Sequence, residues 1–423
     1  MATMDEMNTD HPPALLHPYA RPAAPASSYI VIESGEGAVV VDRAGHRYID
    51  ALASLWYCNI GHGRAEIADA VAAQMRKLDA FHTFDRFTNP PVEAVADQLA
   101  ALAPMEAARV FLTSGGSESV ETAVKLARLA HYVDGHLERT LVVSRRPSYH
   151  GVTYAAMSAT GLPPNHQGFG PLLSEIEQVR RDSLEDLDEL LASRGDRLAA
   201  ILAEPVIGTG GVYPPGEGYL AGLRERCDRH GAFLILDEVI CGFGRLGTWW
   251  AAQHYGVRPD LVTFAKGVTS GYLPLGGVLV GPAVRGPLEA DPSLMLRHGN
   301  TYAGHPSVCA AALANLDIIR AEGLVERANP VGERLRDGLS GLVDGDAVKE
   351  ARGDGAMWAL GLGEGMDAVV LRDALLEQGV IARPIGADTL AYCPPLVITD
   401  REIDRCVEAT SEALAMVAKL RGD

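Results

Sequence analysis

The chain has 423 residues, of which 47% are hydrophobic and 22% are charged. This composition excludes a disordered chain, and the length suits one large domain with a smaller one. The formal net charge of −18 repels a phosphate backbone, so we expect no nucleic-acid partner.

Residues 1–28 are predicted to form an irregular arm, and Tyr29–Asp50 to form two short strands with glycines at the turns. From residue 51 to 281, short apolar runs alternate with helical patterns. The runs are nearly continuous in Val, Leu, Ile and Ala, which is typical of parallel strands buried on both faces. The predicted strands are Arg109–Thr113, Thr140–Ser144, Leu198–Ala203, Ala232–Leu236 and Leu261–Ala265.

Residues 282–305 are predicted to be rich in loops, and Pro306–Ala321 to form a long helix. A last helix is predicted from Asp400 to about Leu420, after a capping box formed by Thr399 and Glu402. We therefore predict an α/β fold in which 51–305 is a large domain with a mostly parallel, mixed sheet. Residues 306–423 form a smaller α+β domain, which the arm and strands of 1–50 join.

The cysteines are scattered without C-x-x-C spacing, which argues against a disulfide framework or a zinc ribbon and favours the cytoplasm. The Pro-rich N-terminal segment has no apolar stretch of the kind found in signal peptides. No apolar run approaches the roughly 20 residues that span a bilayer, so we expect no membrane partner.

Polar residues follow the predicted parallel strands at the point where each strand ends. Glu204, Asp237 and Lys266 come directly after three of the strands, and Ser114–Ser117 and Tyr149–Gly151 follow two others. Open α/β sheets bind ligands just outside the carboxyl ends of their strands. The sequence therefore predicts one site at this edge.

Two interpretations are open for each of these features. Ser114–Ser117 precedes a helical pattern, so it is either a phosphate site at a helix N-terminus or a plain N-cap. Asp237 faces either a protonated heterocyclic nitrogen or a structural cation. Lys266 is either an amine nucleophile with a lowered pKa or a surface lysine.

Other familiar motifs do not fit the chain. Gly242–Gly247 matches G-x-G-x-x-G, but the helical stretch after it is short and Asp260 precedes the next strand instead of ending it. None of the 13 histidines lies in H-E-x-x-H, and no metal site is predicted. A phosphate site, a carboxylate, an aromatic ring and a nucleophilic lysine suit one cofactor, pyridoxal 5′-phosphate (PLP).

The same residues belong to a longer series of motifs. These are Leu55-Trp56, Gly61–Arg64, Thr113–Glu118, Tyr149–Gly151, Glu204-Pro205, Asp237–Arg245, Ala265–Gly267, Thr301–Pro306 and Pro394–Leu396. In this order and at this spacing, over about residues 17–420, the chain resembles a class III aminotransferase of PLP fold type I. Within that family it is most similar to the ω-amino acid or amine–pyruvate type.

The resemblance implies a role for each matching residue. Lys266 would be the Schiff-base lysine and would also move a proton, and Asp237 would pair with the ring nitrogen of PLP. Arg383 would bind a substrate carboxylate and swing away for an amine, unless it forms a surface ion pair. The other cofactor-binding residues would be Gly116, Ser117, Tyr149, His150, Glu204, Val239 and, across the interface of a homodimer, Thr301. The substrate-binding residues would be Trp56, Phe84, Tyr149 and Arg383.

The implied reaction moves an amino group from an amine or ω-amino acid to a 2-oxo acid, pyruvate, by a ping-pong mechanism. An aminomutase or decarboxylase on the same scaffold is the alternative enzyme. If the protein is not an enzyme, the alternative is a non-catalytic scaffold of the same fold. The joint presence of Lys266, Asp237 and Tyr149 argues against that alternative. Asp85, Thr209 and Asn300 depart from the residues common in the family and would make the pocket more polar.

Overall fold

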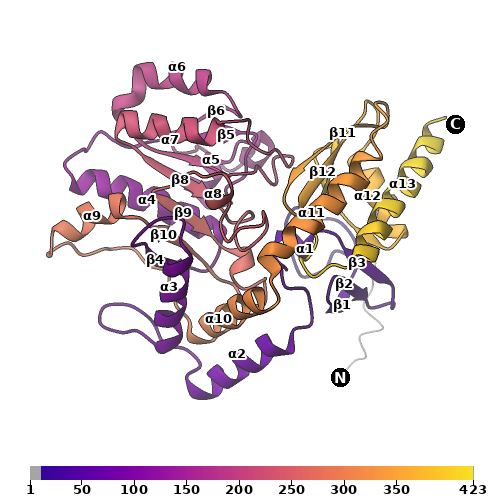
Figure 1. Cartoon of the computed structure of the whole chain (residues 1–423), viewed down its shortest axis with the longest axis horizontal. Helices are drawn as coiled ribbons and strands as arrows, with labels where there is room; N and C mark the ends of the chain where they lie inside the picture. The colour runs from indigo at the N-terminus through magenta and orange to yellow at the C-terminus, as the bar shows by residue number, and fades with distance from the viewer. Residues whose placement is uncertain (1–10, 423) are drawn as a thin grey trace.

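Three β-sheets organise the chain, as the computed structural model shows for residues 11–422 (Figure 1). Residues 1–10 of the predicted arm and Asp423 lie outside the described residues. The largest sheet has seven strands in the order β4-β10-β9-β8-β7-β5-β6. Its strands are β4 (Arg109–Thr113), β5 (Leu141–Arg146), β6 (Ile176–Arg180), β7 (Leu198–Ala203), β8 (Phe233–Asp237), β9 (Leu261–Phe264) and β10 (Gly276–Val280).

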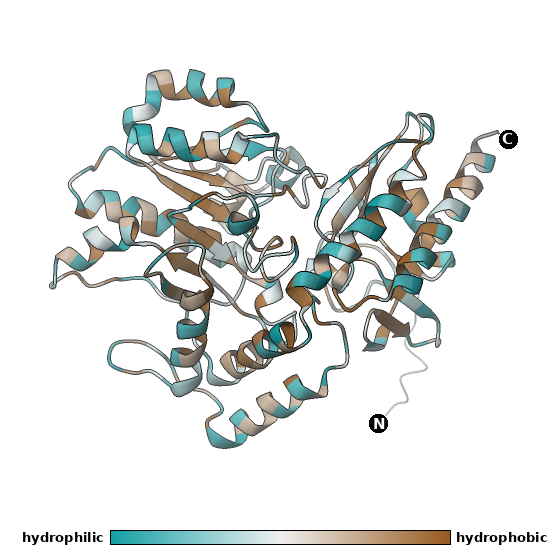
Figure 2. Cartoon of the chain, in the orientation of Figure 1, coloured by the Kyte–Doolittle hydropathy of each residue, from teal (hydrophilic) through white to brown (hydrophobic). Residues whose placement is uncertain are grey.

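The strands from β9 to β6 are parallel to one another, and β10 is antiparallel to both of its neighbours. β7, β8 and β9 are buried along their whole length, as expected for central strands covered on both faces (Figure 2). Their carboxyl ends therefore meet at one edge, as predicted.

Helices cover both faces of this sheet. One face packs against α4 (Gly116–Val133), α5 (Tyr154–Ala159) and α9 (Pro282–Ala290), and the other against α6 (Leu184–Arg194) and α7 (Tyr219–His230). The helix α9 lies in a segment that the sequence predicts to be rich in loops. That prediction is wrong at α9, because Gly286 and Pro287 inside the helix look like loop residues in the sequence.

The other two sheets have four strands each. The first contains β1 (Ile32–Glu36), β2 (Val39–Asp42), β3 (Arg47–Asp50) and β13 (Val380–Ile381), so it joins the two ends of the chain. The prediction of two strands in this region is wrong, because the turn at Gly45 separates a third strand. The second contains β11 (Val348–Asp354), β12 (Met357–Leu362), β15 (Thr389–Tyr392) and β14 (Arg383–Ile385).

Helices α2 (Ala65–Lys77), α3 (Pro90–Leu102) and α10 (Pro306–Ala321) pack together below the large sheet. Helices α11 (Leu324–Ser340), α12 (Ala368–Glu377) and α13 (Asp400–Gly422) pack with the C-terminal strands. The short helices are α1 (Ala53–Trp56) and α8 (Ala251–His254). No helix in the described part of the chain is long and apolar enough to span a bilayer.

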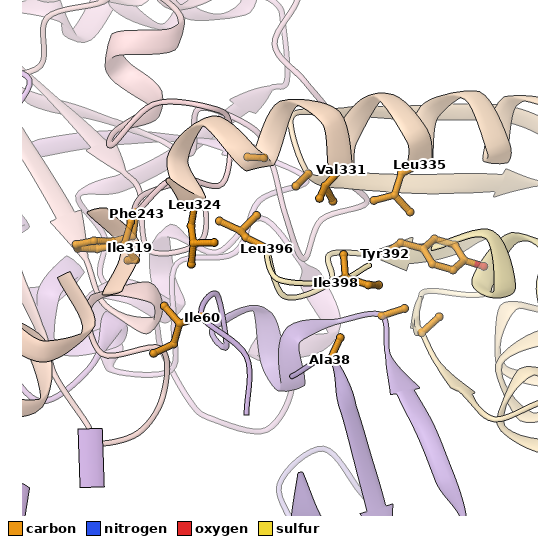
Figure 3. Packing of buried hydrophobic residues seen from close by; sticks show 14 of the residues in the cluster. Ala38, Ile60, Phe243, Ile319, Leu324, Val331, Leu335, Tyr392, Leu396 and Ile398 are labelled. Carbon is orange, nitrogen blue, oxygen red and sulfur yellow. The ribbon is translucent and has the colours of Figure 1, made fainter. Parts of the chain in front are cut away.

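One apolar core connects segments that are far apart in the sequence. Ile60, Phe243 and Ile319 lie at one end of it and Tyr392 at the other, with side chains of α11 between them (Figure 3). Because α10 packs against α2 and α3, it joins the core to the helices beside the large sheet. The division into domains at residues 50 and 305 stays a prediction.

Candidate active site

A cavity of about 150 Å³ lies at the carboxyl ends of β7 and β8, beside the first turn of α4. We refer to it as the lysine cavity. It brings together eight of the residues that the sequence singles out, although their roles stay predictions. Its lining residues are Gly116, Ser117, Tyr149, His150, Gly151, Glu204, Asp237, Val239, Ile240 and Lys266.

Lys266 is held in an unusual backbone conformation. The strand β9 ends at Phe264, and Lys266 begins a short 3₁₀ turn with a φ of +45°, in the left-handed region. Burial lowers the pKa of the Lys266 amine, while the carboxylates of Asp237 and Glu204 act in the opposite direction. A lowered pKa leaves a larger share of the amine unprotonated, which a nucleophile requires.

Asp237 is the last residue of β8, and its carboxylate is 4% exposed. The Oδ1 atom accepts hydrogen bonds from Thr263 Oγ1 at 2.9 Å and from the Val239 amide at 3.2 Å. The Oδ2 atom accepts one from His150 Nδ1 at 2.7 Å. Three donors therefore hold the Asp237 carboxylate in place at the cavity, where it can pair with a basic group.

Glu204 follows β7 and connects it to the loop that carries Tyr149. Its two carboxylate oxygens accept hydrogen bonds from the amides of Tyr149, at 3.0 Å, and Gly208, at 2.9 Å. Burial raises the pKa of Glu204. The buried side chain of Arg145 donates to the Glu204 carbonyl oxygen. Glu204 therefore fixes the backbone from which the Tyr149 ring projects.

The first turn of α4 forms another wall of the cavity. No side chain caps this helix, so the amides of its first turn are available to an anion. The Ser117 hydroxyl accepts a hydrogen bond from the Val152 amide at 3.0 Å, which ties the helix to the loop after Tyr149. A Cβ atom on Gly116 would lie 3.0 Å from Val239 Cγ1, so glycine keeps this wall open.

These residues fit PLP. The cavity holds a buried amine for the aldehyde, a buried carboxylate for the ring nitrogen and an uncapped helix terminus for the phosphate. Tyr149 and Val239 line it as groups that can cover the two faces of a flat ring. The fold and the site together define a PLP-dependent enzyme.

Trp56 and Arg383 do not line the lysine cavity. Trp56 is 2% exposed and packs in the same apolar cluster as Ile240, which does line it. Arg383 lies on β14, close enough to Tyr149 and Tyr19 for their charges to affect its pKa, which burial lowers. The Nε atom of Arg383 is buried and has no hydrogen-bond partner within the described residues.

Phe84 and Thr301 lie elsewhere in the chain. Thr301 is exposed, and Phe84 lines a separate cavity of about 520 Å³ together with Asp85 and Asn300. Thr209 lies outside the lining of the lysine cavity too. Within one protomer, the structure therefore does not bring these residues to Lys266.

Two further residues beside the site are not among those predicted from the sequence. The Tyr19 hydroxyl, in the N-terminal arm, donates to the Tyr149 hydroxyl at 3.4 Å and accepts from Asn165 at 3.1 Å. Nothing in the Pro-rich arm signals this contact. Thr263, the partner of Asp237, lies inside the apolar strand before Lys266, where a polar residue is a usable signal.

Comparison with known proteins shows the family of the chain. The family model for class III aminotransferases matches residues 20–414, and the chain belongs to this family. A diaminobutyrate–2-oxoglutarate transaminase of Halomonas elongata is 35% identical over 98% of the chain and 95% of its own length. A β-alanine–pyruvate aminotransferase of Pseudomonas aeruginosa is 35% identical over 92% of each chain.

Solved structures give the same result. The structure of an amine transaminase from an uncultivated Pseudomonas species, in a PLP-bound form, superposes with a TM-score of 0.93 at 37% identity. The match covers 96% of this chain and all of that one. The predicted fold, the predicted family and the predicted cofactor are confirmed. The protein is an enzyme that transfers amino groups with PLP.

Proposed function

We propose that the enzyme moves an amino group from an amine or ω-amino acid to pyruvate, in two half-reactions that share one cavity. The observation that carries this is the meeting of Lys266, Asp237 and the α4 terminus in the lysine cavity. Two relatives from Pseudomonas aeruginosa, for putrescine and for β-alanine, are named for pyruvate. The relative from Halomonas elongata is named for 2-oxoglutarate, so the acceptor needs a direct test.

The chain's own residues divide the work. Bound PLP supplies an electron sink for the carbon that loses its proton. The Lys266 amine would hold the cofactor, and once a donor amine has replaced it there, the freed amine would take up and return the proton of the donor carbon. Asp237 holds the proton on the ring nitrogen, and His150 and Thr263 keep its carboxylate in place. Tyr149 and Val239 enclose the ring, and Glu204 fixes Tyr149.

Arg383 is the proposed ligand of the pyruvate carboxylate. Its guanidinium is close enough to Tyr149 to feel that group's charge, and it makes no ion pair among the described residues. A guanidinium binds a carboxylate through two parallel hydrogen bonds, and a long side chain can turn away when the donor lacks a carboxylate. One cavity can then accept both substrates.

The variant Arg383→Ala tests this step. We expect a strong rise in the KM for pyruvate and a nearly unchanged half-reaction with a simple amine, with exposed Arg336→Ala as the matched control. The half-reaction is followed by the absorbance of the cofactor. Equal weakening of both half-reactions would assign Arg383 a structural role and contradict the proposal.

An aminomutase or a decarboxylase would use the same cavity without a second oxo acid. A panel of amines with pyruvate distinguishes them, because an aminotransferase forms one alanine for each amine consumed. Turnover of an amine without alanine formation would contradict the proposed reaction.

We further propose a cytoplasmic homodimer. Phe81, Phe84 and Phe87 are between 44% and 51% exposed on one segment, and exposed apolar groups of this kind are typical of interfaces. In a dimer, Phe84 and Thr301 can serve the lysine cavity of the partner.

The six cysteines are free and buried, which suits a reducing compartment.

A further inference from the structure

A cavity of about 500 Å³ lies between α4, the loop 136–140 and the segment 295–298. It shares no lining residue with the lysine cavity. Basic side chains surround it, and no Asp or Glu is among its lining residues, although acidic residues outnumber basic ones by 55 to 37 in the chain. We call it the basic pocket; its basic side chains are Lys125, Arg128, His136, Arg139, Arg297 and His298.

The guanidinium groups at the base of the pocket are held by neutral acceptors. Arg128 donates to the carbonyl oxygens of Thr140 at 2.8 Å and Glu175 at 3.2 Å. Arg139 donates to the carbonyl oxygen of Leu198 at 3.0 Å. Carbonyl oxygens hold these guanidinium groups without cancelling their charge, and the buried Nε of Arg139 has no partner among the described residues. Burial lowers the pKa of Arg128, which shows how incompletely water solvates it.

Carboxylates do occur near the pocket, outside its lining. Glu121 and Glu175 act on Arg128 from a distance, and Asp134 and Glu138 each lie 3.7 Å from a ring nitrogen of His136. None of them pairs with an arginine or lysine of the pocket within the described residues. The charged side chains in the lining itself are therefore all cationic, and the nearby carboxylates lie outside it.

A histidine fixes the lysine at the rim. Lys125 Nζ donates to His298 Nδ1 at 3.0 Å, since an ammonium can only donate. Burial and the Lys125 charge lower the pKa of His298, so its ring is neutral at pH 7 and its Nε2–H donates to Thr122 Oγ1, at 2.9 Å. The ring also stacks on Phe111 at 5.2 Å. Lys125 is thus oriented by a rigid group.

Apolar side chains complete the pocket. Tyr132, Leu137 and Met295 are between 63% and 66% exposed, and Leu296 is 41% exposed. A cluster of large, exposed apolar side chains is typical of a binding site. An apolar wall beside cationic side chains that make no ion pair among the described residues matches a ligand with an anionic head and an apolar body.

We propose that the basic pocket binds an amphipathic anion, with a carboxylate or sulfonate head and an alkyl or aryl body. The volume lies within the range of sites that take small organic ligands. The head lies against Lys125 and the arginines, and the body against Leu137 and Met295. This site is separate from the lysine cavity and goes beyond the proposed transfer of amino groups.

Titration calorimetry of the PLP-loaded enzyme with decanoate tests the proposal. We expect binding that weakens at least tenfold in the double variant Lys125→Gln/Arg297→Gln and falls with added salt. The pair Arg336→Gln/Arg372→Gln, on α11 and α12 outside the pocket lining, is the matched control and should bind as the parent does. Decyltrimethylammonium, which has the same body and the opposite charge, should not bind.

A second variant separates the basic pocket from the substrate site. Arg383→Ala should leave decanoate binding unchanged, and the double variant should keep the parent aminotransferase rate. Failure of the proposed aminotransfer would show in the rate assay alone. Three results would each overturn the proposal. The double variant could keep the parent affinity for decanoate, the cation could bind as well as decanoate, or decanoate could fail to bind because a second copy of the chain covers the pocket.

Discussion

Asp237 decides whether a proton can stay on a ring nitrogen in the lysine cavity. Replacing it with Asn keeps the shape but removes the charge that His150 and Thr263 now support. Losing a buried, charge-assisted hydrogen bond costs roughly 2–4 kcal/mol, so we expect a rate loss on the order of 10²-fold. Steady-state kinetics checks this, with exposed Asp373→Asn as control. A rate within about threefold of the parent would count against the assignment.

Glu238, the next residue, makes stability depend on pH. It is fully buried, accepts hydrogen bonds from the amides of Ala251 and Ala252, and has a pKa raised from 4.5 to about 8 by burial. Because the folded protein holds this proton more tightly than the unfolded chain, its stabilisation is complete below pH 4.5 and is lost as the pH rises through about 8.

The variant Glu238→Gln cannot release a proton, so this contribution disappears. We expect the Tm of the parent to fall more between pH 6 and pH 9 than the Tm of the variant does, by scanning calorimetry. Parallel curves would mean that Glu238 stays ionised in the folded protein.

At the residue scale, the sequence predicts the residues proposed to react better than the residues that hold them in place. Lys266 and Asp237 are recognisable because a charged residue beside a buried apolar strand is costly to bury unless it has a partner. The contact between Tyr19 and Tyr149 could not be predicted, because it depends on how the N-terminal arm lies over the site. Trp56, which the resemblance implies as a substrate-binding residue, is buried in the same apolar cluster as Ile240, and its role stays a prediction.

Among the elements, the first turn of α4 carries the proposed phosphate site. In Gly116→Ala the new methyl group would lie 3.0 Å from Val239 Cγ1, so Val239 must shift into the space for the ring. We expect PLP to bind at least about tenfold more weakly, as measured by absorbance after dialysis. Gly286→Ala in α9, whose Cβ would meet nothing within 4 Å, is the control and should bind PLP normally. Equal affinity in both variants would place the phosphate elsewhere.

Five strands of the large sheet could be predicted because they are continuous apolar runs. The edge strand β6 is not among the predicted strands, because Ile176 and Val179 are its only apolar residues and they form no continuous run. The strand β10 was missed because it begins with Gly276 and Gly277, which look like a turn. A Cβ on Gly277 would lie 2.5 Å from Phe264 Cζ, so the tertiary packing requires glycine there.

For the whole molecule, the separation of Phe84 and Thr301 from Lys266 makes the predicted dimer testable. If the partner completes each lysine cavity, the active species sediments at twice the 44.9 kDa mass of the chain. Analytical ultracentrifugation at assay concentrations measures this. A fully active monomer would show that one chain is sufficient and that Thr301 has no role across an interface.

Attachment of the cofactor to Lys266 is the claim on which the whole account depends. The chain has five lysines, at positions 77, 125, 266, 349 and 419, so the site of attachment can be mapped without ambiguity. Borohydride reduction of the PLP-loaded enzyme, followed by peptide mapping, should place the cofactor on Lys266 alone, and Lys266→Ala should show no multiple turnover. Label on one of the other four lysines, or sustained turnover by the variant, would contradict the account.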